Sequence, residues 1–253
     1  MKRISFTPSA LRAARAAVLA ALVHAIPLQA AEDARAEVQI NLCAPSDAVV
    51  RALHLRPAES FESWYFESPG RVHHRRGHVF RLRTGSSGAQ LTLKVADQDC
   101  EKVRRDLLPA RDAKCEYDIH GVKPVGAVSI TRSLSADASR ALLDGRVALA
   151  DVLSPAQKRY LEATGGWPLA GGIERLGPAR IRAYRSAGVK YVVEAWTLPG
   201  DERFVEISQK APLMSAAALQ AELETMLDRA AVPRCADQSS QAAAKLDAML
   251  AHR

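Results

Sequence analysis

Several short segments of this chain alternate charged and apolar residues, and this pattern restricts the folds that the chain can adopt. Because successive side chains of a β-strand point to opposite faces, Arg81 and Arg83 would share one face of a strand while Phe80 and Leu82 share the other. The same separation recurs along the chain, with the polar face carrying Thr92 and Lys94, Glu116 and Asp118, Arg180 and Arg182, Glu194, and Glu206 and Ser208.

Two arrangements satisfy strands of this kind. An antiparallel sheet can bury its apolar face and leave the charged face in water. A closed barrel can instead turn the apolar faces outward, beneath helices such as 215–230, and the charged faces into a lumen. Like charges come in pairs such as Arg81 with Arg83, which repel each other unless an anion lies between them, and basic and acidic strands are separate. These two features favour the barrel, whose buried charges must be paired, hydrated or bound to an ion.

The remaining patterns indicate one α+β domain over residues 31–253. Alternating, β-branched or aromatic runs predict strands over 37–42, 63–67, 78–84, 90–96, 114–120, 172–176, 179–184, 190–197 and 204–209. Runs rich in alanine and leucine predict helices over 135–143, 154–164, 215–230 and 239–251. Ser154 followed by Pro155 is typical of a helix start, with serine as the cap and proline in the first turn.

Residues 1–30 have the pattern of a secretory signal peptide. A basic start without acidic residues precedes an apolar run over 16–25, and small residues follow at Ala30 and Ala31, with 34–36 as a second cleavage option. The apolar run is shorter than the roughly 20 residues of a membrane span; an uncleaved anchor is the alternative. We therefore expect a periplasmic or secreted protein without stable membrane insertion after cleavage.

The formal net charge of +7 includes the basic residues of the predicted signal peptide, so it is weak evidence for nucleic-acid binding. The leader holds four of the 35 basic residues and no acidic residue, which leaves 31 basic against 28 acidic residues. Because the balance is nearly even, we expect no nucleic-acid partner.

The chain has four cysteines, none of them in a CxxC motif or a metal-like cluster. An even number in an exported protein suggests disulfides, and four cysteines allow three pairings. We favour Cys100 with Cys115, which would close a loop between two strands, and Cys43 with Cys235, which would join the two ends of the domain. Buried free thiols are the alternative.

The order and spacing of the motifs resemble the CYTH family of triphosphate tunnel enzymes, which includes class IV-like adenylyl cyclases, thiamine triphosphatase and inorganic triphosphatases. The resemblance covers most of residues 37–210. It is carried by Trp64-Tyr65-Phe66-Glu67, Arg81-Leu82-Arg83, Leu91-Thr92-Leu93-Lys94, Cys115-Glu116-Tyr117-Asp118, Arg180-Ile181-Arg182, Glu194 and Phe204-Val205-Glu206-Ile207.

The resemblance implies an eight-stranded antiparallel β-barrel, or tunnel, with flanking α-helices. It implies a small phosphorylated or polyphosphate ligand, whose oxygens would be held by Arg81, Arg83, Lys94, Arg180 and Arg182. It also implies Mg²⁺ or Mn²⁺ on a carboxylate wall formed by Glu37, Glu116, Asp118, Glu194 and Glu206.

Two departures from the family pattern concern this carboxylate wall. The family opens with ExExK, whereas this chain reads Glu37-Val38-Gln39-Ile40-Asn41 and lacks the second acid and the lysine. The closing ExE motif reads Glu206-Ile207-Ser208. A site without these carboxylates should bind its metal less tightly.

Three functions remain open at this point. The first is a metal-dependent hydrolase acting on a triphosphate or polyphosphate. The second is a non-catalytic binder of an anion on the same scaffold. The third is a structural envelope protein whose barrel charges pair with one another.

Overall fold

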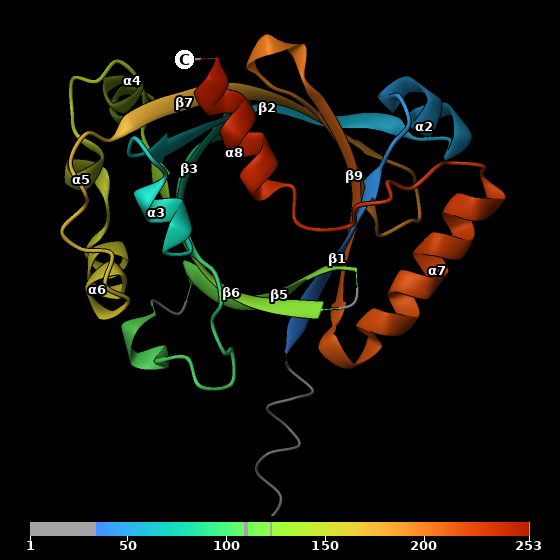
Figure 1. Cartoon of the computed structure of the whole chain (residues 1–253), viewed down its shortest axis with the longest axis horizontal. Helices are drawn as coiled ribbons and strands as arrows, with labels where there is room; N and C mark the ends of the chain where they lie inside the picture. Colours follow the sequence, from blue (N-terminus) through green and yellow to red (C-terminus); the bar gives the residue numbers. More distant parts are fainter. Residues whose placement is uncertain (1–33, 109–110, 122, 253) are drawn as a thin grey trace, which may run out of the picture.

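The computed structural model describes residues 34–108, 111–121 and 123–252, which form a closed β-barrel with helices around it (Figure 1). The signal peptide predicted over residues 1–30 lies outside the described residues. In the part that is described, no helix is both long and apolar enough to cross a membrane.

Nine strands close the barrel in the order β1-β5-β6-β4-β3-β2-β7-β8-β9, and β9 pairs with β1. All neighbours pair antiparallel except β1 and β5, which are parallel. The predicted α+β barrel is confirmed, but the expected eight antiparallel strands are corrected to nine strands of mixed direction. The strands are β1 (Arg35–Leu42), β2 (Arg56–Glu67), β3 (His78–Gly85), β4 (Gly88–Val95), β5 (Ala113–His120), β6 (Lys123–Leu134), β7 (Glu174–Arg185), β8 (Val192–Thr197) and β9 (Arg203–Pro212).

The strand that the sequence patterns missed is β6. Its lumen-facing residues Ala127, Ser129 and Thr131 are small and uncharged, so β6 lacks the alternation of charged and apolar residues. Gly126 allows a close approach, because a Cβ atom there would lie 1.9 Å from the carbonyl oxygen of Gln98. Pairing with β4 and β5, which is not visible in the local sequence, places this strand in the barrel.

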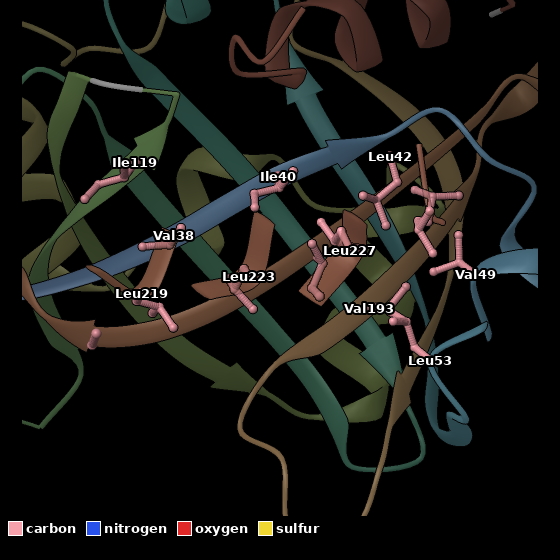
Figure 2. Packing of buried hydrophobic residues seen from close by; sticks show 14 of the residues in the cluster. Val38, Ile40, Leu42, Val49, Leu53, Ile119, Val193, Leu219, Leu223 and Leu227 are labelled. Atoms are coloured by element: carbon pink, nitrogen blue, oxygen red, sulfur yellow. The ribbon is translucent and has the colours of Figure 1, made fainter. Parts of the chain in front are cut away.

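Helices α2 (Ser46–Ala52) and α7 (Ala216–Arg229) cover the outer face of β1, β8 and β9. Leu219, Leu223 and Leu227 follow the helical spacing of four and lie in one cluster with Val38 and Ile40 of β1 (Figure 2). Burying a leucine of this kind contributes about 1.5–3 kcal/mol. The prediction that apolar strand faces point outward beneath this helix is confirmed here.

A second group of helices covers the outer face of β3, β4 and β6. The Ser154 hydroxyl accepts a hydrogen bond from the Gln157 backbone, and the Gln157 side chain accepts one from the Ser154 backbone, as the predicted helix start requires. The Gln157 amide also donates to the carbonyl oxygens of Leu91 and Ile130, which anchors the helix to two neighbouring strands. The helices of this group are α4 (Ala136–Leu143), α5 (Leu149–Val152) and α6 (Pro155–Ala163), and the short 3₁₀ turns of the chain are Arg105–Leu107, Pro199–Asp201 and Leu213–Ser215.

The last helix, α8 (Ala242–Ala251), packs on the inner face of the barrel wall. Its Leu246 and Met249 lie in one buried cluster with Ile181 of β7 and Trp196 of β8. Figure 1 shows α8 across the barrel opening, beside β7. Because a helix covers this side of the barrel from within, the inner face of β7 is apolar.

Two disulfides join the pairs that were predicted, and both pairings are confirmed. Cys100 is bonded to Cys115 and Cys43 to Cys235. The second bond lies where the backbone N–H of Cys235 donates to the carbonyl oxygen of Asn41. It therefore fastens the segment that leads into α8 to the end of β1.

Replacing Cys100 and Cys115 together with serine should lower the free energy of unfolding by about 3 kcal/mol, because the bond closes a loop with a separation of 15 residues. Replacing Cys43 and Cys235 should lower it by about 5 kcal/mol, since their separation is 192 residues. Denaturant titrations of both variants would measure these losses, and equal losses would contradict the dependence on loop length.

Two histidines are buried in the protein: His73 within the short helix α3 (Val72–Arg75) and His78 at the start of β3. The His73 ring packs edge-on against Phe80 at 5.3 Å between ring centroids. His78 Nε2 lies 3.1 Å from the Thr164 hydroxyl. Burial lowers the pKa of both imidazoles from the ordinary 6.5. The folded protein therefore resists protonation that the unfolded chain accepts.

The free energy of unfolding should consequently fall as the pH drops below about 6.5 toward the lowered pKa values of His73 and His78. His73→Leu should make this decline shallower, because one imidazole no longer resists protonation. His54→Asn, at an exposed position, is the matched control and should keep the wild-type slope. Urea titrations between about pH 7.5 and pH 5 would show this, and an unchanged slope in His73→Leu would contradict it.

Candidate functional site

The barrel encloses a cavity of about 490 Å³, which we call the lumen. Alternate residues of every strand except β7 line it, together with residues at the start of α8. Its walls carry six basic and five acidic side chains, so the charges nearly balance. The basic residues are Arg81, Arg83, Lys94, Lys114, Lys210 and Lys245, and the acidic residues are Glu37, Glu116, Asp118, Glu194 and Glu206.

Arg81 and Arg83 lie side by side in the lumen on β3, as predicted from the strand alternation. Arg83 packs its guanidinium over the Phe61 ring at 4.5 Å, and its Nε is buried without a hydrogen-bond partner. Burial, reinforced by the charge of Arg81, lowers the pKa of Arg83 to about 10. Arg83 stays charged at neutral pH, so the pair leaves a donor unsatisfied and two neighbouring guanidinium groups in repulsion.

Arg180 and Arg182, by contrast, lie on the outer face of β7. Ile181, which lies between them, is the cross-strand partner of Trp196 on β8, and Trp196 lines the lumen. Because cross-strand partners point to the same face and neighbouring residues to opposite faces, Ile181 points inward and the two arginines point outward. The Arg180 side chain is 75% exposed. The prediction that this pair lines the tunnel is wrong, because α8 covers the inner face of β7 and requires apolar contacts there.

The five carboxylates predicted to bind a metal do meet in the lumen, but each lies beside a cation of the chain. Lys210 Nζ lies 2.8 Å from Glu116 Oε2 and 3.5 Å from Glu37 Oε2. Lys114 also bonds to Glu116. Burial alone would raise the pKa of Glu116, but the hydrogen bonds from the two lysines outweigh burial and lower it.

The other carboxylates are paired in the same way. Lys94 bonds to Asp118. Arg83 Nη2 lies 3.9 Å from Glu194 Oε1. Burial raises the pKa of Glu194, while Arg83 opposes this change.

Lys245 enters the lumen from α8 and pairs with Glu206 at 2.8 Å. The two side chains are only 8% and 14% exposed. The ammonium group also lies 4.0 Å from the centroid of the Trp196 ring, which favours a cation through its π-electrons. This lysine is therefore a buried cation with a fixed place.

Such a donor set does not fit Mg²⁺ or Mn²⁺, which require several free oxygen ligands at short range. Ammonium and guanidinium groups already lie against the carboxylates that a metal would need. Among the described residues, no group of three or more His, Cys, Asp or Glu side chains is placed to hold a metal ion. The arrangement instead pairs anionic and cationic side chains of the chain itself.

Three lumen cations, Lys114, Lys210 and Lys245, were not predicted. Lys114 continues the alternation that ends at Asp118, and Lys210 continues the one that begins at Glu206, so the strand pattern contained a signal for both. Lys245 lies in an alanine-rich helix, where the local sequence gives no sign of a buried charge.

Comparison with known proteins shows the fold. No protein-family model and no curated protein matches the sequence. The solved structure of HpAC1 from Hippeastrum, provisionally assigned as an adenylyl cyclase and described as revealing a dominant triphosphatase activity, is similar with 16% identity and a TM-score of 0.58, covering 83% of this chain and 94% of that one. A provisionally assigned adenylate cyclase from Bacillus halodurans is similar with 11% identity and a TM-score of 0.57, covering 82% and 96%. At these identities the likeness extends to the fold alone.

Lys245→Met should lower the free energy of unfolding by about 3 kcal/mol, because it leaves Glu206 nearly buried without its cation. Adding Glu206→Gln to that variant should recover much of the loss, since no unpaired charge remains. Lys102→Met, at a lysine that is 84% exposed, is the control and should change stability by less than about 0.5 kcal/mol. Urea titrations would measure all variants, and strictly additive losses would contradict the pairing.

Proposed function

From the premise that this chain has the fold of the CYTH, or triphosphate tunnel, proteins, we propose that its lumen binds a phosphate-rich anion such as tripolyphosphate. The cavity of about 490 Å³ lies within the roughly 300–1,000 Å³ typical of small-molecule sites. Guanidinium and ammonium groups are the side chains best suited to phosphate oxygens.

The observation that supports this proposal most strongly is the Arg81–Arg83 pair. The Nε of Arg83 is buried without a hydrogen-bond partner, and Glu194 Oε1 lies 3.9 Å from Nη2 of the same guanidinium group, too far for a hydrogen bond. An anion between the two guanidinium groups would accept this hydrogen bond and remove the repulsion between them. Lys94 on the adjacent strand β4 supplies a third cation to the same cavity.

We further propose that the protein is exported. The two disulfides support this, because such bonds persist mainly in oxidising compartments. Of the two candidate cleavage sites, the one after Ala30 keeps the barrel intact. Cleavage after Ala36 would remove the start of β1 and the carbonyl group of Ala34, which accepts a hydrogen bond from Leu213.

Hydrolysis of the bound anion is the second candidate function, favoured by the triphosphatase activity attributed to the Hippeastrum protein. The pairing of every predicted metal-binding carboxylate with a cation weighs against it, and for this reason we place binding first. Phosphate release from tripolyphosphate, measured with and without Mg²⁺ or Mn²⁺, separates the two functions, because a pure binder releases none.

Tripolyphosphate should raise the melting temperature of the oxidised protein, and Arg81→Gln/Arg83→Gln should abolish this shift. Losing hydrogen bonds from charged donors, each worth about 1.5–3 kcal/mol, should weaken binding more than about tenfold. Arg180→Gln/Arg182→Gln removes an identical motif from the outer face of β7 and should leave the shift unchanged. Isothermal titration calorimetry would check the affinities.

Either of two results would contradict the lumen site. One is a wild-type protein that shows neither a thermal shift nor heat of binding with tripolyphosphate, which would favour a structural role for the barrel charges. The other is a loss of binding in the outer double variant that equals the loss in the lumen variant.

A further inference from the structure

The acidic wall of the lumen is interrupted by two uncharged residues that face each other. Gln39 of β1 stands opposite Ser208 of β9, and both line the lumen. Two residues along the same ladder, on the same face, Glu37 stands opposite Lys210, so a lysine is built directly into this wall. A divalent cation placed here would meet two neutral side chains and an ammonium group beside the carboxylate of Glu37.

Lys210 bridges the two carboxylates nearest to it. Its Nζ lies 2.9 Å and 2.8 Å from the two oxygens of Glu116 and 3.5 Å from Glu37. Its ammonium group therefore occupies the space between two carboxylates from different strands.

Lys245 likewise pairs with a carboxylate of the acidic wall, that of Glu206. Contacts of the preceding segment hold Lys245 in this position. The helix that carries it follows a segment that is bonded to β1: the Asn41 side chain donates to the carbonyl oxygens of Asp237 and Ser239, and Cys235 is bonded to Cys43. A metal that took Glu206 would leave this buried ammonium group unpaired, which is strongly unfavourable.

We propose that Lys210 and Lys245 are resident counter-cations of the acidic wall, so that the lumen takes up its phosphate-rich anion without Mg²⁺ or Mn²⁺. This inference rests on the proposed anion binding and adds how the site balances its charge. Together with Lys114, the two lysines balance the charges of Glu37, Glu116 and Glu206, so these three carboxylates do not oppose the attraction of Arg81 and Arg83 for the anion.

The first experiment is calorimetric titration of the oxidised full-length mature protein with tripolyphosphate in EDTA, and again in excess Mg²⁺. Binding in EDTA is expected, and Mg²⁺ should leave it unchanged or weaken it, because Mg²⁺ competes for the free anion. Binding that appears only with Mg²⁺ overturns the inference but keeps the proposed function. Absence of binding in both buffers overturns the proposed function and, with it, the inference.

The second experiment titrates the ligand-free protein with Mn²⁺ and follows the free ion by electron paramagnetic resonance. No saturable binding is expected up to millimolar Mn²⁺, and saturable binding in that range overturns the inference. Lys210→Met should create measurable Mn²⁺ binding, because it frees Glu37 and one side of Glu116, and should weaken tripolyphosphate binding in EDTA roughly tenfold.

Lys102→Met is the matched control, because it removes the same charge from an exposed position outside the lumen. It should gain no Mn²⁺ binding and lose no affinity for tripolyphosphate. A second variant, Glu206→Gln/Lys245→Met, tests the other counter-cation without leaving an unpaired charge, and should still bind tripolyphosphate in EDTA. A requirement for Mg²⁺ in that variant would overturn the inference, because its anion binding would then depend on a metal.

Discussion

Charges that face the interior of a closed barrel must be compensated, and this requirement explains much of the molecule. A charge removed from water without a partner is strongly destabilising, so eleven charged side chains around one lumen can coexist only if they are arranged against each other. In this chain the carboxylates are paired with lysines and arginines from neighbouring strands and from α8. Arg83 is only partly compensated, since Glu194 lies 3.9 Å from its Nη2 while its buried Nε has no hydrogen-bond partner.

The helix α8 decides how the rest of the barrel is used. It makes the inner face of β7 apolar, so the arginines of that strand point to solvent. It also delivers Lys245 to Glu206 and so neutralises a carboxylate that would otherwise be available to a ligand or ion. The disulfide between Cys43 and Cys235 fixes the segment that leads into α8. The proposed anion site therefore lies on the side of the lumen that holds Arg81, Arg83 and Lys94.

The fold shared with the Hippeastrum and Bacillus proteins does not by itself set the charges that the lumen of this chain encloses. A common barrel supplies the inward direction of alternate side chains, and the identity of those side chains sets the chemistry. Here Gln39 and Ser208 reduce the negative charge of one wall, while Lys210 and Lys245 bring positive charge to it. Both changes act in the same direction, away from a cation site and toward an anion site.

The sequence by itself determined the strand alternation and the helix start at Ser154, and it favoured the barrel class, both disulfide pairings and the placement of Arg81, Arg83 and Lys94 in a common cavity. These features depend on the spacing and chemistry of residues that lie close together in the sequence. Only the tertiary structure decided which face of β7 is inside, that β6 completes the barrel, and that Lys245 reaches Glu206 from a distant helix. Alternation separates two faces of a strand, but the elements packed on each face decide which of them meets water.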